Sequence, residues 1–168
     1  MAVTIGIDPG ATYTGVSVRN GDELLLSSTY VKPKDTPPIT WAIEVSTRIQ
    51  HEVISLYPEA LVGIEGVTVP NAYNQGKLAL NSPKYIIWTA LIVGAVAANN
   101  PNAVIVRPGK NGSQDLSSYP VALSGRRPKD LAGVSAGAGT RNHEKSAWDI
   151  AGEVEGLLRD NYKLDDRV

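Results

Sequence analysis

Two acidic residues each stand at the end of a short apolar run and directly before a turn-forming residue. Asp8 lies in "GIDPG" and Glu65 lies in "VGIEG". An acid at the end of a buried strand is costly unless it is paired or bound to a cation. If the two strands are parallel neighbours, both carboxylates lie at the same edge of the sheet, where two like charges need a cation or a shared proton. Two carboxylate oxygens suit Mg²⁺.

A third group of candidates lies near the C-terminus, in "RNHEKSAWDIA" (141–151). His143, Glu144, Ser146 and Asp149 fall within two helical turns, and the positive N-terminal end of a helix suits an acidic site or a phosphate. At 100° per residue, the apolar stripe centres near Val154, so His143 lies about 20°, Ser146 about 80° and Asp149 about 140° from it. His143 is therefore expected to face the sheet. The alternatives are a half-buried structural histidine and, for Asp149, a solvated surface acid.

Length and composition limit what can surround these residues. The chain has 168 residues, which suits one domain over 1–160 with a flexible tail over 161–168. It has no cysteine, so thiol nucleophiles and thiolate zinc sites are excluded, and any metal must be held by Asp, Glu or His. We find no signal-type segment and no apolar run long enough for a membrane span, so we expect a cytoplasmic protein without a membrane partner.

The order of elements predicts an α/β fold. We expect a five-stranded mixed sheet of three antiparallel opening strands and then parallel strands, with helices on both faces. The expected strands are 3–8, 15–19, 23–30, 60–64 and 103–106, and the expected helices are 40–57, 85–98 and one that begins near 142. The helix over 85–98 carries no charged residue, so we expect it to be buried on all sides.

The stretch 108–142 is rich in glycine and lacks periodicity, so we expect a long mobile loop. Basic residues outnumber acidic ones from 104 to 145, although the whole chain has a net charge of −1. We expect this loop to be a binding element rather than a linker. The basic residues in it and just before it include Arg107, Lys110, Arg126, Arg127 and Lys129. The alternative is an ordinary solvated loop.

Three motifs together resemble one family. "GIDPGATYTG" (6–15) resembles the opening of the RuvC-type Holliday junction resolvases of the RNase H-like nuclease superfamily, "IEG" their second acidic motif, and "HEKSAWDIA" their closing helix. The resemblance spans 4–151 and implies an RNase H-like sheet order with Asp8 and Glu65 as the first two metal ligands. It further implies two Mg²⁺ ions per site, replaceable by Mn²⁺, and hydrolysis of a phosphodiester that leaves a 5′ phosphate. His143 would order the attacking water or act as an acid or base.

The closing helix departs from the family pattern. One alignment places Ser146 where the last carboxylate is expected, with His143 three residues before it. The other alignment makes Asp149 that carboxylate. We expect Asp149 to supply the charge, His143 to assist, and Glu144 to be the reserve ligand.

The resemblance also suggests how a four-way junction would be held. Such a junction is nearly two-fold symmetric, so paired cuts by a domain with one site call for a homodimer. The charge-free helix over 85–98 would supply part of the interface, the alternative being a central helix of a monomer. The family carries an aromatic residue soon after the second acid, where this chain has Thr68. Tyr73 is the nearest stand-in for that aromatic residue, and Lys77 lies in the same polar loop, which could contact bases at the crossover. The contacts with DNA phosphates would come from Arg107, Lys110, Arg126, Arg127 and Lys129.

Other activities share parts of these motifs. A related nuclease that cuts flaps, forks or RNA–DNA hybrids would use the same acids, and a junction-binding protein that does not cleave would account for Ser146. Sugar kinases and actin-like ATPases also open with a Gly-x-Asp-x-Gly hairpin, but their architecture needs two such domains. No second glycine-rich phosphate loop is found, so we expect no nucleotide cofactor.

Overall fold

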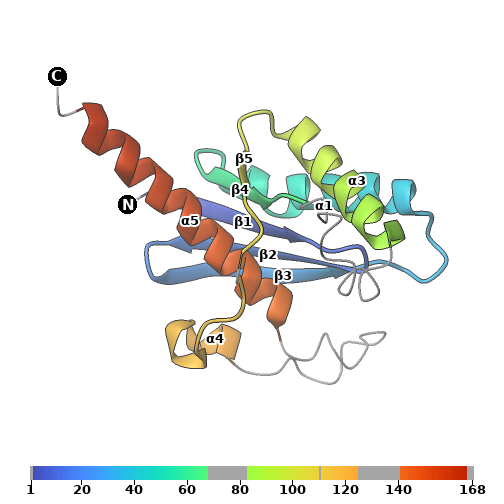
Figure 1. The fold of residues 1–168 in the computed structure, drawn as a ribbon, viewed down its shortest axis with the longest axis horizontal. Helices are drawn as coiled ribbons and strands as arrows, with labels where there is room; N and C mark the ends of the chain where they lie inside the picture. The colour runs from blue at the N-terminus through green and yellow to red at the C-terminus, as the bar shows by residue number, and fades with distance from the viewer. Residues whose placement is uncertain (1, 68–82, 110, 125–140, 166–168) are drawn as a thin grey trace, which may run out of the picture.

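The computed structural model describes residues 2–67, 83–109, 111–124 and 141–165, with side chains up to 157 (Figure 1). The opening strands β1 (Val3–Pro9), β2 (Tyr13–Asn20) and β3 (Glu23–Val31) are antiparallel, and β4 (Leu61–Glu65) and β5 (Val104–Val106) continue the sheet in parallel. The strand order is β3-β2-β1-β4-β5. This is the five-stranded mixed sheet expected from the sequence. In the described part of the chain, no helix is long and apolar enough to cross a membrane.

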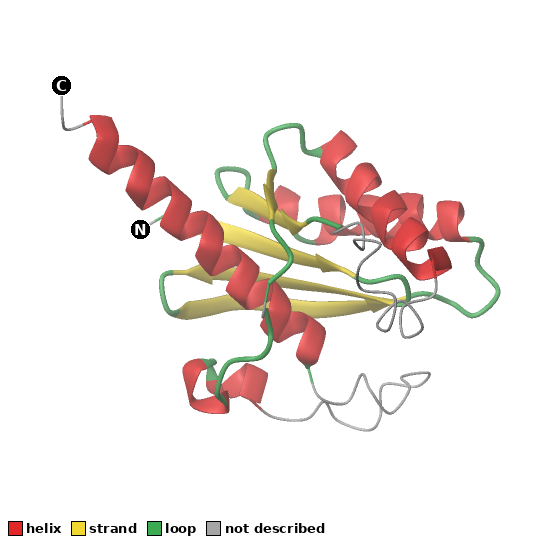
Figure 2. Ribbon diagram, in the orientation of Figure 1, coloured by secondary structure: helices red, strands yellow, loops and turns green. Residues whose placement is uncertain are grey.

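Helices cover both faces of the sheet. Figure 2 shows α5 (Asn142–Asp165) running diagonally across one face. On the other side, α1 (Pro38–Glu52) and α3 (Pro83–Asn99) pack against each other, and a short 3-10 turn, η1 (Ile54–Leu56), follows α1. Every other side chain along each strand points toward α1 and α3, because successive side chains lie on opposite faces of a sheet. This larger core consists mainly of Ile5, Ile7, Val16, Val18, Trp41, Val45, Ile49, Val62, Ile64, Ile92 and Val96.

The face of the sheet under α5 is made of very small residues. A Cβ atom on Gly6 would overlap the carbonyl oxygen of Ala147, and one on Gly15 would overlap that of His143. Ser17 of β2, which pairs with Gly6, donates a 2.7 Å hydrogen bond to the carbonyl oxygen of Glu144. The backbone of α5 therefore lies directly on β1 and β2, and its first turn is fixed above the end of β1.

The apolar helix differs from its prediction of burial on all sides. Within α3, Ile92 and Val96 are buried, whereas Tyr85 is 44% and Ile87 60% exposed. The reason is that only one stripe of α3 rests on α1 and the sheet. The opposite stripe, which carries Ile87, Ala90, Gly94 and Ala98, is apolar and faces outward in the single chain.

The region predicted as a long loop over 108–142 contains two short helical pieces, η3 (Leu116–Ser118) and α4 (Val121–Ser124). They are held by a small apolar cluster of Tyr119 and Leu123 with Trp148 of α5. That cluster could not be recognised from periodicity. Residues 110 and 125–140 of this predicted loop lie outside the described residues. At the other end, α5 continues to Asp165, so residues 161–165 belong to this helix; the flexible tail over 161–168 stays a prediction.

Candidate active site at the carboxyl edge of the sheet

Asp8 and Glu65 lie side by side at the ends of two neighbouring parallel strands. Ile7 of β1 is paired with Ile64 of β4, so the two acids are the next residues along each strand. The alternation of side chains turns both toward α5. Burial raises the pKa of Glu65, and the negative charge of Asp8 adds to that rise. We call Asp8 and Glu65 the strand-end pair.

His143 of α5 completes this side of the site. Its Nδ1 lies 2.8 Å from Oδ2 of Asp8, with 13% of the Asp8 side chain and 33% of the His143 side chain exposed. The imidazole also stacks on the ring of Tyr13, with 5.5 Å between centroids. The histidine thus faces the sheet, and it is oriented by a carboxylate on one side and an aromatic ring on the other. The sequence analysis missed Tyr13, whose only signal was its place in the hairpin after Asp8.

Glu65 has two further partners from the segment that follows β5. The side-chain amide of Asn111 donates a 2.7 Å hydrogen bond to Oε1 of Glu65, and the backbone N–H of Gly109 also donates to this carboxylate. Both bonds favour the ionised acid and so lower its pKa, against the effect of burial. Asn111 was also missed, because nothing in "PGKNG" shows that it returns to β4.

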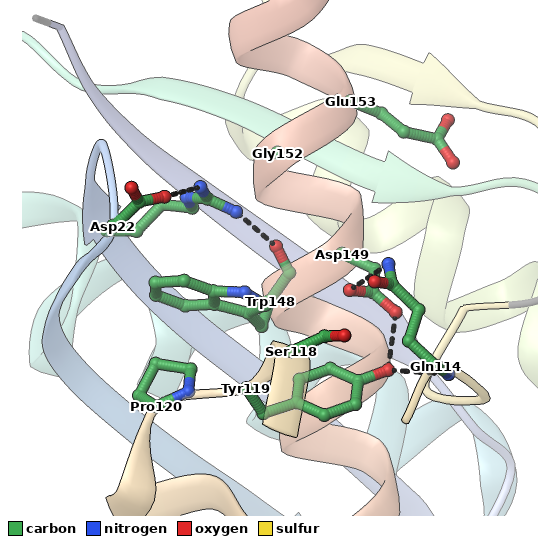
Figure 3. A pocket seen from close by; sticks show the side chains of 10 residues that line it. Asp22, Gln114, Ser118, Tyr119, Pro120, Trp148, Asp149, Gly152 and Glu153 are labelled. Carbon is green, nitrogen blue, oxygen red and sulfur yellow. Dashed lines mark hydrogen bonds and ion pairs between the residues drawn. The ribbon is translucent and has the colours of Figure 1, made fainter. Parts of the chain in front are cut away.

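Asp149 has a different set of partners. Its Oδ2 accepts hydrogen bonds from the backbone N–H of Gly112 at 2.7 Å and from the hydroxyl of Tyr119 at 2.8 Å. Its Oδ1 accepts one from the side-chain amide of Gln114 at 3.0 Å (Figure 3). The carboxylate therefore points toward the segment 112–119. This agrees with the sequence analysis, which placed Asp149 far around the helix from the apolar stripe.

The predicted grouping of Asp149 with the strand-end pair is not found. Among the described residues, no three acidic or histidine side chains lie close enough together to hold a metal ion. The assignment of Asp149 as the last metal ligand stays a prediction. Ser146, the other candidate position, is 9% exposed and lies against the backbone of Gly112. Glu144, the reserve ligand, is fully buried.

The strand-end pair suits a divalent cation. It offers two hard oxygen donors, and Mg²⁺ is commonly held by one or two carboxylates together with water and substrate phosphates. A cation beside the pair would offset both the burial of Glu65 and its repulsion by Asp8, which are the two causes that raise the pKa of Glu65. The residues present therefore fit Mg²⁺ or Mn²⁺.

Of the predicted DNA contacts, only Arg107 can be located. It follows β5 directly and is exposed. The others, Tyr73, Lys77, Lys110, Arg126, Arg127 and Lys129, lie outside the described residues.

Two solved structures resemble this chain over nearly its whole length. T. thermophilus RuvC in complex with a Holliday junction substrate is 18% identical, covers 90% of both chains and superposes with a TM-score of 0.58. The chain has a RuvC-type, RNase H-like fold. A second T. thermophilus RuvC structure is 19% identical over 89% of this chain and 90% of that one, with a TM-score of 0.51. The RuvC-type fold agrees with the fold expected from the sequence.

Comparison of the sequence alone gives no further relatives. No protein-family model matches the chain, and no curated protein matches it.

Proposed function

We propose that this protein is a Mg²⁺-dependent endonuclease that resolves four-way DNA junctions by paired, symmetric nicks. The observation that carries the proposal is the strand-end pair with His143 hydrogen-bonded to Asp8, at the carboxyl edge of a RuvC-type sheet. A solved structure of similar fold holds a Holliday junction substrate.

In this proposal, Asp8 and Glu65 hold Mg²⁺, with two ions per site as the family resemblance implies. The metal would supply activation of water and stabilisation of the charge on the leaving oxygen. Asp8 and Tyr13 orient His143 at the edge of the sheet where, in this proposal, the reacting phosphate would lie. Its imidazole can accept a proton from the attacking water or return one to the leaving group.

The junction would be held through its phosphates. Arg107 is exposed at the end of β5, and Lys110 stands between Gly109 and Asn111, both of which contact Glu65. We propose that these two cations contact the strand being cut. Arg126, Arg127, Lys129, Lys77 and Tyr73 remain the candidates for the wider DNA surface. Two copies of the chain, paired through the exposed stripe of α3, would cut the two symmetric strands.

Cleavage of a synthetic immobile four-way junction tests the proposal. Wild type with Mg²⁺ is expected to make paired nicks that Asp8→Asn abolishes, because the variant keeps the shape of the side chain but loses its charge. Matched duplex, flap and RNA–DNA hybrid substrates are cut in parallel. Preferential cleavage of a flap or hybrid would instead assign the site to a related nuclease.

A junction-binding protein that does not cleave is the second candidate. It is favoured by Ser146 in the closing helix and by the Asp149 carboxylate, which is taken up by three hydrogen bonds within the fold. Under this alternative, wild type binds the junction tightly and leaves it intact with either Mg²⁺ or Mn²⁺.

A further inference from the structure

We infer that Asp149 is a positioning residue for Glu65, acting through the segment 111–119 rather than as a metal ligand. The inference rests on the proposed function, because it concerns how the strand-end pair is prepared for its cation. It assigns a role to an acid that, among the described residues, does not form a metal-binding group with Asp8 and Glu65.

The first step is the anchor on α5. One carboxylate, that of Asp149, accepts hydrogen bonds from Gly112, Gln114 and Tyr119. Burial raises the pKa of Tyr119 to about 12, and the charge of Asp149 contributes to the rise, so the phenol keeps its proton and acts as a donor. The Tyr119 hydroxyl in turn accepts a 3.1 Å bond from the backbone N–H of Gln114. Bonds to an ionised acceptor are about twice as strong as neutral ones, so this segment is firmly held.

The second step runs from the anchor to Glu65. The backbone N–H held by Asp149 belongs to Gly112, and the next residue toward the N-terminus is Asn111, whose side chain donates to Glu65. Gly112 has a φ of +75°, and a Cβ atom there would lie 3.1 Å from the carbonyl oxygen of Asn142 and 3.2 Å from the backbone nitrogen of Ser146. The turn is therefore pressed against α5, which fixes where the Asn111 side chain begins.

The consequence concerns the orientation of a metal ligand. The Asn111 amide holds Oε1 of Glu65 at 2.7 Å, so the plane of this carboxylate depends on the position of the 111–112 turn. Partners that hydrogen-bond to a ligating carboxylate commonly change metal affinity by about 10-fold to 100-fold when they are removed. Asp149 would then influence the cation site without touching it.

Mn²⁺ binding to the full-length, DNA-free protein tests this inference by isothermal titration calorimetry. We expect Asn111→Ala and Asp149→Asn each to raise the Mn²⁺ Kd by about 10-fold. Because both substitutions break the same connection, the double variant is expected to bind about as well as the weaker single variant. Glu153→Gln is the matched control. Its charge also acts on Glu65, but within the described residues its carboxylate makes no hydrogen bond to the segment 111–119, so we expect it to raise the Kd by a much smaller factor than Asp149→Asn does.

Two outcomes would overturn the inference while leaving the proposed function intact. If the losses in the double variant multiply, Asp149 acts on the ion by itself, as a direct ligand would. If Asn111→Ala binds Mn²⁺ like wild type and wild type still cuts junctions, the 111–112 turn plays no part. A wild type that neither binds Mn²⁺ nor cleaves would overturn both the inference and the proposed function.

Loss of folding is controlled with a milder variant. Tyr119→Phe keeps the Asp149 carboxylate and removes one of its three donors. It is expected to raise the Mn²⁺ Kd by a smaller factor than Asp149→Asn, with far-ultraviolet circular dichroism identical to that of wild type. The positioning role would be contradicted if Tyr119→Phe had an unchanged Mn²⁺ Kd and if Asp149→Asn were fully folded and also bound Mn²⁺ with the wild-type Kd.

Discussion

Glu65 is held in a position that opposes its own ionisation. Burial and the charge of Asp8 raise its pKa, whereas the hydrogen bonds from Asn111 and Gly109 lower it without cancelling the rise. The folded protein therefore binds this proton more tightly than the unfolded chain does. In the absence of a cation, the charged form of Glu65 weakens the fold, which is typical of a site prepared for a ligand.

Glu65→Gln should accordingly stabilise the metal-free protein at pH 7. A carboxyl whose pKa is raised by folding contributes stability below its unfolded pKa, about 4.3, and that stability is lost as pH rises through the folded value. The gain from Gln should therefore be present at pH 7 and vanish near pH 4. Urea unfolding with a chelator at both pH values measures it, and Glu59→Gln, at an exposed position, is the control. A less stable Glu65→Gln at pH 7 would contradict this account.

Single residues were predictable where a regular element places them. Asp8 and Glu65 follow from strand ends, and His143 follows from the helical period, so their positions could be expected before the structure was known. Asp149 was expected to be a metal ligand because of its negative charge, although its position about 140° from the apolar stripe of the helix pointed away from the sheet. Its hydrogen bonds to Gly112 and Tyr119 agree with the angular position. Tyr13 and Asn111 reach the site through a hairpin and an irregular turn, whose tertiary contacts leave no periodic signal.

At the scale of elements, the close approach of α5 to the sheet decides whether His143 reaches Asp8. Gly6 and Gly15 face the helix backbone, and no larger residue fits beneath it. The hydrophobic pattern of the sequence predicted the helix and the strands but not how closely α5 approaches the sheet.

The helix α1 was expected over 40–57 but ends at Glu52. Val53 leaves the helical conformation, and the apolar stripe that suggested a longer helix continues into η1.

Gly6→Ala should displace α5 from β1. The added methyl group would overlap the Ala147 carbonyl, and overpacking of this kind costs about 1–3 kcal/mol or more. Cleavage should fall as well, because His143 moves away from Asp8. Gly156→Ala on the same helix is the control. Its Cβ meets nothing within 4 Å, so a gain of roughly 0.5–1 kcal/mol is expected. Denaturant unfolding of both variants gives the comparison, and equal stabilities would show that the helix is not tightly seated.

For the molecule as a whole, the chain order was sufficient to predict the sheet and the layers of helices, because short connections and right-handed crossovers leave few arrangements. It was not sufficient to predict what covers α3. An apolar helix looks the same in sequence whether its second face is buried by its own chain or by another copy. The structure separates the two faces, since Ile92 and Val96 are buried while Ile87, on the opposite face, is 60% exposed.

That exposed stripe leads to a prediction for the assembly. We expect wild type to be a dimer at micromolar concentration and Ile87→Glu to be a monomer. Ile87 is 60% exposed in the single chain, so the substitution should leave the melting temperature of the monomer nearly unchanged. Leu157→Glu is the matched control, because Leu157 is 50% exposed on α5, on the opposite face of the sheet.

Light scattering after size exclusion gives the masses, and junction cleavage gives the functional consequence. A dimer that places one site on each symmetric strand should make both nicks in one encounter, whereas monomers should nick the two strands independently. Ile87→Glu is therefore expected to accumulate singly nicked junctions while Leu157→Glu cuts like wild type. A monomeric wild type that still makes paired nicks, or an Ile87→Glu variant that remains dimeric, would place the interface elsewhere than on α3.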